Sequence, residues 1–234
     1  MKLQDKEEPL YEDNHIIVVK KPANLLTQPD PEHEHISLED KVKEYLKKKY
    51  EKKGNVFLHA IHRLDKEVSG LVLFAKSSKA LSRLNEEMKK KEIERKYLAL
   101  VEGKFERKKE TLKHYLLHVH HVSEVAEKSN KNAKLAILDY EVLKEKKLDG
   151  KTVSLVSITL ETGRYHQIRS QFSIIHHPIV GDSKYGSSIQ SSSIWLHGYY
   201  LSFIHPVTKK EMEFEWLPDS ENDRNFIGIF LNHE

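Results

Sequence analysis

Residues 153–161 constrain the fold most, because apolar side chains occupy both alternating faces of a predicted β-strand. Val153 and Leu155 share one face, and Val156 and Ile158 share the other. A strand that is apolar on both faces is typical of the interior of a sheet. Within residues 10–20, a turn at Asp13-Asn14 and the β-branched run 16–19 predict a short strand. Other apolar runs predict strands over 58–61, 71–76, 97–101, 113–126, 134–143, 194–203 and 211–216.

Only three stretches carry a helical pattern. The first follows Ser37 and the second follows Ser77 or Ser78, whose hydroxyls suit an N-cap. The third lies near residues 166–176. The apolar stripes of the first two helices are Leu38, Val42, Tyr45 and Leu46, and Leu81, Leu84 and Met88. Many strands, few helices and no regular strand–helix alternation predict an α+β fold with a mainly antiparallel sheet. A short apolar stretch at 226–231 follows the last strand.

The composition narrows the functional classes. The chain has 234 residues, which fits one large domain or two small ones, and we expect one catalytic-size domain. It contains no cysteine, so disulfides, thiolate nucleophiles and cysteine-bound metal sites are excluded. The first residues are acidic and lack an apolar core, and no apolar run approaches the length of a membrane span. We therefore expect a cytoplasmic protein without a signal peptide.

Two lysine runs, 41–53 and 89–96, stand out against a net charge of only +3. Such runs are usually solvated faces of helices, and a surface that binds nucleic acid is the alternative. The sequence alone leaves both interpretations open.

A polar loop at residues 62–67 separates two apolar strands and contains His, Arg, Asp, Lys and Glu. Polar loops held by a rigid scaffold often carry active sites. The alternative is a surface turn in which Asp65 and Ser69 bond to the backbone.

A second polar cluster follows the predicted central strand, which ends at Gly163. Arg164, His166, Gln167 and Arg169 lie at the start of the third helix. Free N–H groups and the helix dipole favour an anionic ligand at such a position. Ordinary capping with a solvated basic turn is the alternative.

Together these segments resemble the RluA-type family of pseudouridine synthases. Residues 62–76 (HRLDKEVSGLVLFAK) match the block that in this family reads His-Arg-Leu-Asp-Lys-x-Thr-Ser-Gly. Residues 162–169 (TGRYHQIR) and 178–186 (PIVGDSKYG) match two later blocks in the same order. The resemblance extends over about residues 9–220, including the opening segment 10–23.

Four positions depart from the family pattern. Val68 replaces a Thr, Tyr165 replaces a Thr, Ser170-Gln171 replaces a Val-His pair, and Asn24 stands where Gly is usual. We expect Tyr165 and Gln171 to alter how RNA is held. Only about nine residues precede the first matching strand, so the N-terminal S4-type domain of some relatives is not expected.

The resemblance implies an isomerase that converts specific uridines of structured RNA to pseudouridine. Asp65 is expected to be the catalytic carboxylate, Arg169 its partner, and Tyr97 the residue that stacks on the extruded base. RNA contacts are expected from His62, Arg63, Lys66, Lys96, Arg164, His166 and Gln167. The implied fold is a bent, mainly antiparallel sheet with flanking helices and a central cleft.

The chemistry implied by the resemblance needs neither a cofactor nor a metal, because no redox step or group transfer occurs. The expected partner is RNA, with ribosomal RNA slightly favoured over transfer RNA, and the expected state is a monomer without a membrane partner. His118, His120 and His121 do not suggest a metal site, because strand alternation places His121 on the opposite face from the other two and no recognised ligand spacing follows.

Two other functions compete with this interpretation. A non-catalytic RNA-binding or ribosome-assembly protein could use the same scaffold, but loss of Asp65, Tyr97 or Arg169 would have favoured it, and all three are present. A glycoside hydrolase could pair Asp65 with Glu67 or Glu161. Two carboxylates so close along one loop rarely face each other, which disfavours the Asp65–Glu67 pair.

Overall fold

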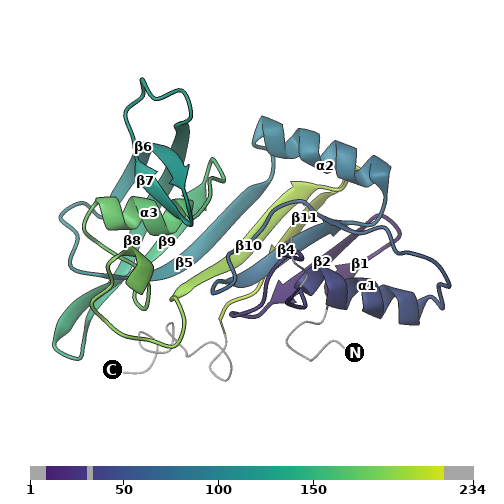
Figure 1. The fold of residues 1–234 in the computed structure, drawn as a ribbon, viewed down its shortest axis with the longest axis horizontal. Helices are drawn as coiled ribbons and strands as arrows, with labels where there is room; N and C mark the ends of the chain where they lie inside the picture. The colour runs from purple at the N-terminus through teal and green to yellow at the C-terminus, as the bar shows by residue number, and fades with distance from the viewer. Residues whose placement is uncertain (1–8, 31–33, 219–234) are drawn as a thin grey trace. The chain divides into compact units, whose positions relative to one another are not determined.

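The structure is a computed structural model that describes residues 9–30 and 34–218. These residues form two compact units, coloured along the chain in Figure 1. The first unit contains the chain up to Ile93 together with Gly198–Leu217, and the second contains Glu94–His197. The expectation of one catalytic-size domain stays a prediction.

The first unit is built on antiparallel strand pairs. Its strands are β1 (Pro9–Glu12), β2 (Ile16–Lys21), β3 (His59–Ala60), β4 (Ser69–Ala75), β10 (Leu196–Ile204) and β11 (Glu211–Glu215). Their order is β1-β2-β4-β10, with β3 paired to β4 and β11 paired to β10. The turn between β1 and β2 is closed by Asp13, whose carboxylate accepts hydrogen bonds from the backbone N–H groups of His15 (2.7 Å) and Ile16 (2.8 Å).

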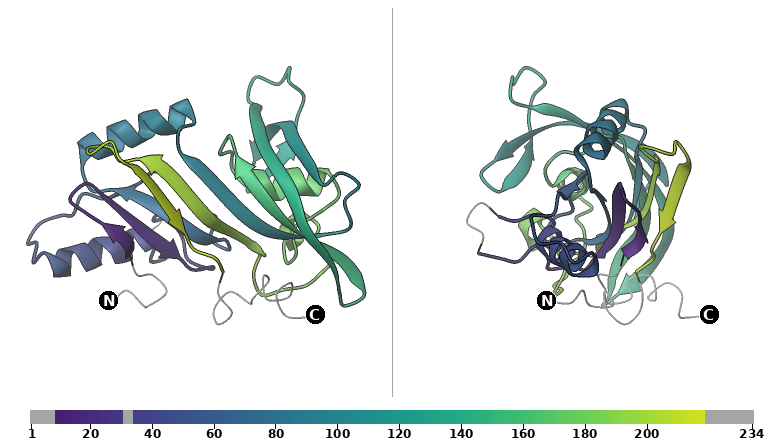
Figure 2. Two further views of the ribbon diagram at one scale, coloured as in Figure 1. Left: turned by 180° about the vertical axis from the view of Figure 1, so that it is seen from behind. Right: turned by 90° about the vertical axis from the view of Figure 1, so that its right-hand side faces the viewer.

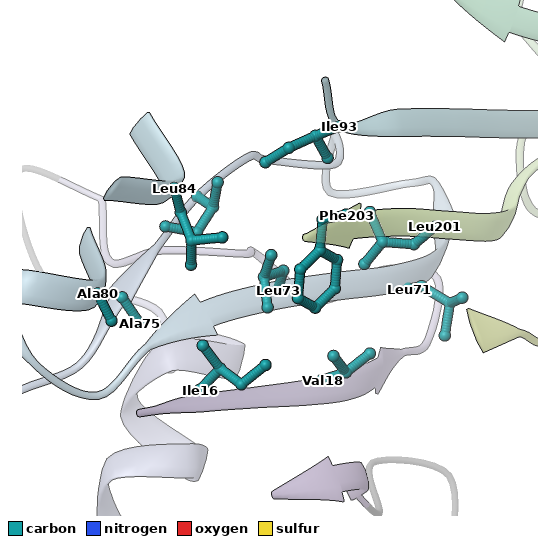
Figure 3. Packing of buried hydrophobic residues seen from close by; sticks show 11 residues of the cluster. Ile16, Val18, Leu71, Leu73, Ala75, Ala80, Leu84, Ile93, Leu201 and Phe203 are labelled. Atoms are coloured by element: carbon teal, nitrogen blue, oxygen red, sulfur yellow. The ribbon is translucent and has the colours of Figure 1, made fainter. Parts of the chain in front are cut away.

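One apolar cluster packs the first unit together, as Figure 3 shows. Ile16 of β2 and Leu73 of β4 meet Phe203 of β10 and Leu84 of a helix that follows β4. Ile17 lies on the opposite face of β2 and is also fully buried. Both faces of β2 are therefore covered, as its unbroken β-branched run requires.

Both helices of this unit begin where the sequence predicts. Helix α1 (Leu38–Lys49) is capped by Ser37, which forms a reciprocal capping box with Asp40. Helix α2 (Ser78–Lys90) is capped by Ser77. Asn24, at a position where the family has Gly, adopts a φ of +64°, and Asn is one of the few other residues that tolerates this left-handed backbone.

The second unit is a five-stranded antiparallel sheet with one α-helix on it. Its strands are β5 (Glu94–Glu102), β6 (Lys109–Val119), β7 (Val122–Val125), β8 (Lys134–Leu148) and β9 (Lys151–Leu160), in the order β5-β9-β8-β6-β7. Strand β9 lies between β5 and β8, which confirms the predicted central strand. Helix α3 (Gln167–Ile174) packs against β6 and β7, and Figure 2 shows it from further sides.

The predicted strand over 113–126 is wrong in one respect. It is two strands, β6 and β7, joined by a tight turn at His120-His121. His120 has a φ of +51°, a left-handed conformation that the sequence does not signal because no Gly or Pro is present. The strand alternation assumed for the three histidines therefore does not continue to His121.

The predicted apolar stretch at 226–231 lies outside the described residues. No helix in residues 9–30 and 34–218 is long and apolar enough to cross a membrane.

Candidate active site

The loop that carries Asp65 connects β3 to β4 and is fixed from within the first unit. The hydroxyl of Thr27 donates to the carbonyl of Leu64 (2.7 Å) and accepts from the N–H of the same residue (3.1 Å). The N–H of Val68 donates to the backbone carbonyl of Asp65 (3.1 Å), which closes a turn that begins at Asp65. The backbone on both sides of Asp65 is therefore held by hydrogen bonds.

A buried lysine supports the same loop. Lys21 is fully buried, and its ammonium donates to the carbonyls of Leu25 (2.6 Å), Pro22 (3.0 Å) and Lys66 (3.2 Å). A buried ammonium is costly unless it is hydrogen-bonded, so these carbonyls account for its place in the interior. Lys21 thus ties the residue after Asp65 to the segment that follows β2.

The side chains of this loop differ in exposure. Arg63 and Lys66 are exposed, and Asp65 is half-buried. His62 is buried, and its Nε2 lies 3.4 Å from the N–H of Leu73, which would donate to it. His62 was predicted to contact RNA, and the structure places it against the neighbouring strand.

The loop returns to β4 through Gly70, where no other residue fits. Gly70 has a φ of +143°, and a Cβ there would lie 2.6 Å from the backbone nitrogen of Gly198 in β10. Two backbones thus approach closely at the start of β4, immediately after the candidate catalytic loop.

The other two predicted catalytic residues belong to the second unit. Tyr97 lies in β5 opposite Ile158 of β9 and is almost completely buried. Its neighbour Lys96 is half-buried, with its ammonium 3.3 Å from Glu94.

Arg169 is buried and contacts three other side chains of this unit. Its Nε donates to one carboxylate oxygen of Asp182 (2.7 Å) and its Nη2 donates to the other (3.0 Å). Its guanidinium carbon lies 5.2 Å from the ring centre of Tyr185, and Nη1 lies 3.2 Å from Nε2 of His166. Such a bidentate pair fixes the plane of the guanidinium as well as its position.

The predicted RNA contacts at the start of α3 have internal partners. His166 is buried, has a φ of +47°, and shares a hydrogen bond of 3.0 Å between Nδ1 and the Tyr185 hydroxyl. Its ring stacks on that of Tyr165, with centres 3.9 Å apart, and Tyr165 also meets His118. The residue that replaces the family's Thr is therefore packed between two histidines.

The side chain of Gln167 forms its hydrogen bonds within the second unit. Its side-chain oxygen accepts from Thr162 Oγ1 (2.7 Å) and from the N–H of Arg164 (3.0 Å), and its amide nitrogen donates to Ile137 (3.0 Å). Arg164 is exposed, and its Nε donates to the carbonyl of Leu135. Arg164 is thus better placed than Gln167 to meet a ligand.

Gln171, the second departure near α3, is a core contact. It is fully buried, and its amide nitrogen donates to the carbonyl of Leu112 (3.3 Å) in β6. This side chain holds α3 to the sheet.

A half-buried carboxylate orders the segment that follows Asp182. Glu102, at the end of β5, accepts hydrogen bonds from the Ser187 hydroxyl (2.6 Å) and from the N–H groups of Ser188 (2.7 Å) and Ile189 (2.9 Å). Burial would raise the pKa of Glu102, but these hydrogen bonds outweigh it and hold the pKa below its usual value.

Sequence reasoning missed four residues that build these sites. Asp182 and Tyr185 lie in the block at 178–186, which carried the resemblance but received no role. Thr27 and Lys21 gave no signal, because a threonine in a loop and a lysine at a strand end are usually solvated. In the part of the chain that the structure describes, no three His, Asp or Glu side chains converge as a metal would require.

Comparison with known proteins identifies the family. Residues 15–174 match the family model for RNA pseudouridylate synthase. tRNA pseudouridine synthase C of Haemophilus influenzae is 30% identical, with 88% of this chain and 90% of that protein covered. Ribosomal large subunit pseudouridine synthase C of Buchnera aphidicola is 31% identical, with 87% and 64% covered. The chain belongs to the RNA pseudouridylate synthase family.

A solved structure agrees with this assignment at the level of the fold. Human RNA pseudouridylate synthase domain containing 1 matches with a TM-score of 0.72 at 24% identity, over 94% of this chain and 87% of that one. The predicted α+β pseudouridine synthase fold is thereby confirmed. The chain spans about two thirds of the length of several curated relatives, 64% of the Buchnera protein among them.

Proposed function

We propose that this protein is an RNA pseudouridine synthase that isomerises uridine in structured RNA, with Asp65 as the catalytic carboxylate. The observation that carries the proposal is the loop around Asp65, held by Thr27 on one side and Lys21 on the other. A half-buried carboxylate on a fixed loop is suited to approach a ribose with little loss of side-chain freedom.

The reaction rearranges bonds within one nucleotide. The bond between N1 of uracil and C1′ of ribose breaks, the base turns, and a bond forms between C5 and C1′. C5 loses its proton and N1, released from C1′, gains one, so the atoms balance without a cofactor. Asp65 would either attack C1′ or remove the C2′ proton, and both routes start from an ionised carboxylate.

Arg169 and Tyr97 complete the proposed machinery. A guanidinium next to Asp65 would favour the charged carboxylate and orient it, and Asp182 already holds the guanidinium of Arg169 in one plane. The ring of Tyr97 would stack on the base after it leaves the RNA helix, a step that costs a few kcal/mol. Arg63, Lys66 and Arg164 are exposed and would meet phosphates.

Ribosomal RNA is the first proposed substrate and transfer RNA the second. One observation favours transfer RNA as an alternative: the chain spans 90% of the Haemophilus protein, whose name contains tRNA, against 64% of the Buchnera protein. The two candidates differ only in which RNA carries the modified uridine.

The test maps pseudouridines by carbodiimide labelling and primer extension in RNA from three strains. One lacks the protein, one carries only Asp65→Asn, and one carries only Glu67→Gln, a matched carboxylate change in the same loop. We expect one uridine to lose its mark in the first two strains and to keep it in the third. A mark in ribosomal RNA or in transfer RNA names the substrate.

Two results would contradict the proposal. A mark that survives Asp65→Asn but vanishes in the deletion strain removes Asp65 from catalysis. Unchanged marks in every strain favour a non-catalytic RNA-binding protein on the same scaffold.

A further inference from the structure

A hollow of about 800 Å³ lies beside the second half of α1, within the first unit. It is lined by Lys43, Glu44, Lys47, Lys48, Gly54, Asn55 and Val56, and we call it the lysine groove. Its volume is in the range that holds one or two nucleotide-sized groups. None of these residues belongs to the predicted catalytic site.

Positive charge is concentrated at this groove. Residues 41–53 contain seven lysines and two glutamates, a formal charge of +5, whereas the whole chain carries +3. The rest of the chain is therefore at −2. A local field of this kind attracts a polyanion even when the protein is close to neutral.

The lysines at the groove are available to a ligand. Lys47, which lines the groove, and Lys53, which precedes the lining residue Gly54, are exposed and form no ion pair within residues 9–30 and 34–218. Lys43 and Lys48 pair with glutamates one turn earlier on α1, at 2.7 Å in both cases. The Lys48–Glu44 pair is exposed on both sides, and such a pair contributes only about 0.3–0.5 kcal/mol, so a phosphate could replace Glu44 at little cost. Glu39 is buried, so Lys43 is the less available of the two lysines.

The helix dipole explains the positions of only some of the lysines in residues 41–53. Lysines in the last turn of a helix, as at Lys47–Lys49, complement the partial negative charge of that end. Lys52 and Lys53 lie beyond the end of α1, and the dipole effect falls off within the last turn.

Exposed aromatic rings accompany these lysines. Tyr50, where α1 ends, is 46% exposed, and Phe57, which follows the groove residue Val56, is 40% exposed. The ammonium of Lys52 lies 5.9 Å from the ring centre of Tyr50. Exposed rings among lysines are typical of surfaces on which unpaired bases stack while cations hold the phosphates.

We propose that the lysine groove binds the RNA substrate at phosphates away from the target uridine. This inference rests on the proposed function, which supplies the RNA. An anionic membrane is the competing partner, but a helix that lies on a membrane exposes its apolar face. The apolar residues of α1, among them Val42 and Leu46, are fully buried.

The first test changes charge alone. One double variant combines Lys47→Gln and Lys53→Gln. The control double variant combines Lys128→Gln and Lys131→Gln, two exposed lysines of a turn in the second unit. The full chain is titrated with a fluorescein-labelled RNA hairpin that has a single-stranded tail, at several salt concentrations. Two lost phosphate contacts should weaken binding at least about tenfold near 0.1 M salt and flatten the plot of log affinity against log salt by about 1.4–1.8. The control should bind within about twofold of wild type.

The second test fills the groove without changing charge. A Cβ at Gly54 meets nothing within 4 Å, so Gly54→Leu should fold normally and occupy part of the hollow. We expect a loss of hairpin affinity with an unchanged circular dichroism spectrum and melting temperature. Unchanged affinity would show that the hollow itself is not used.

The outcomes separate this inference from the proposed function. Release of tritium from RNA labelled at uracil C5 should show a raised KM and an unchanged kcat for the double lysine variant. If the wild-type protein releases no tritium from any RNA, the proposed function fails while the binding comparison still decides the groove. Equal hairpin binding by variant and wild type overturns the inference. So does a loss confined to vesicles of phosphatidylcholine and phosphatidylserine, which would assign the groove to a membrane.

Discussion

The carboxylate of Asp182 accepts two hydrogen bonds from one guanidinium, that of Arg169, at 2.7 Å from Nε and 3.0 Å from Nη2. The two side chains are 1% and 4% exposed, so the pair is almost free of solvent. Within this pair, each charge depends on the other for its place in the interior.

Removing that carboxylate charge should therefore destabilise the protein. We expect Asp182→Asn to lower the free energy of unfolding by about 3–5 kcal/mol, because it takes one carboxylate charge and a bidentate pair of hydrogen bonds away from a buried guanidinium. Urea unfolding followed by circular dichroism measures the change. The control is Glu141→Gln, whose pair with Lys109 is exposed, and its effect should stay below about 1 kcal/mol. Similar effects of the two substitutions would contradict the burial argument.

Thr27 should matter because its single hydroxyl serves both backbone groups of Leu64. Thr27→Val keeps the shape and leaves a buried N–H and carbonyl unpaired, which costs about 1–3 kcal/mol. We expect lower stability and slower release of tritium, since the loop that carries Asp65 loses its anchor. Thr111→Val is the matched control, because Thr111 is exposed and its hydroxyl donates to the side chain of Asp139 at the surface. If tritium release is as fast in Thr27→Val as in the control, the anchor does not position the loop.

Gly70 should not tolerate a side chain. In Gly70→Ala the new Cβ meets the backbone of Gly198 while φ stays at +143°, so overlap and strain together should cost about 3 kcal/mol or more. Gly150→Ala also has a positive φ, +78°, but meets nothing within 4 Å and should cost only about 1–2 kcal/mol. The urea midpoint of Gly70→Ala reports overlap and strain together, and that of Gly150→Ala reports strain alone. Equal midpoints would contradict the close approach of the two backbones at Gly70.

Acid should remove the contribution that the ionised carboxylate of Glu12 makes to the stability of the fold. Burial would raise the pKa of Glu12, but hydrogen bonds from Lys49, Lys76 and Tyr50 outweigh it and lower the pKa to about 2 from 4.5. Because the folded pKa is the lower one, the stabilisation is complete above about pH 4.5 and is lost as the pH falls toward 2. Its size is about 3 kcal/mol.

Comparison of wild type with Glu12→Gln checks this sign. The difference in unfolding free energy should be largest at neutral pH and should shrink through acidic pH to near zero at about pH 2. Glu86→Gln, whose pair with Lys90 is exposed, serves as the neutral-pH control and should cost under about 1 kcal/mol. A difference between Glu12→Gln and wild type that stays constant with pH would rule out the charge of Glu12 as its cause.

The local elements could be predicted because their signals are local. Ser37 and Ser77 cap the helices that their positions predict, and the two apolar faces of β9 place it inside a sheet. The turn at His120 could not be predicted, because no Gly or Pro marks its left-handed backbone. The order of the strands could not be predicted either, because the pairing of β9 with both β5 and β8 depends on contacts between segments that are distant in the sequence.

The candidate site was predictable as a set of motifs but not as an arrangement. Residue blocks at 62–76 and 162–169 pointed to Asp65 and Arg169. That Asp182 would accept two hydrogen bonds from Arg169 depends on how the chain folds back after α3 ends at Ile174, and no periodic pattern in the sequence indicates this. The burial of Lys21 was equally hidden, because its carbonyl partners are backbone groups that any sequence possesses.

The way the chain leaves the first unit and re-enters it at Gly198 has a consequence for biosynthesis. A ribosome releases the chain from its N-terminus, yet Leu201 and Phe203 of β10 belong to the apolar cluster built on β2 and β4. When residue 197 emerges, every strand of the second unit is available, whereas the first unit still lacks β10 and β11. The half of the protein that is translated first is therefore the last that can finish folding, and its unfilled core is exposed to chaperones and aggregation in the meantime.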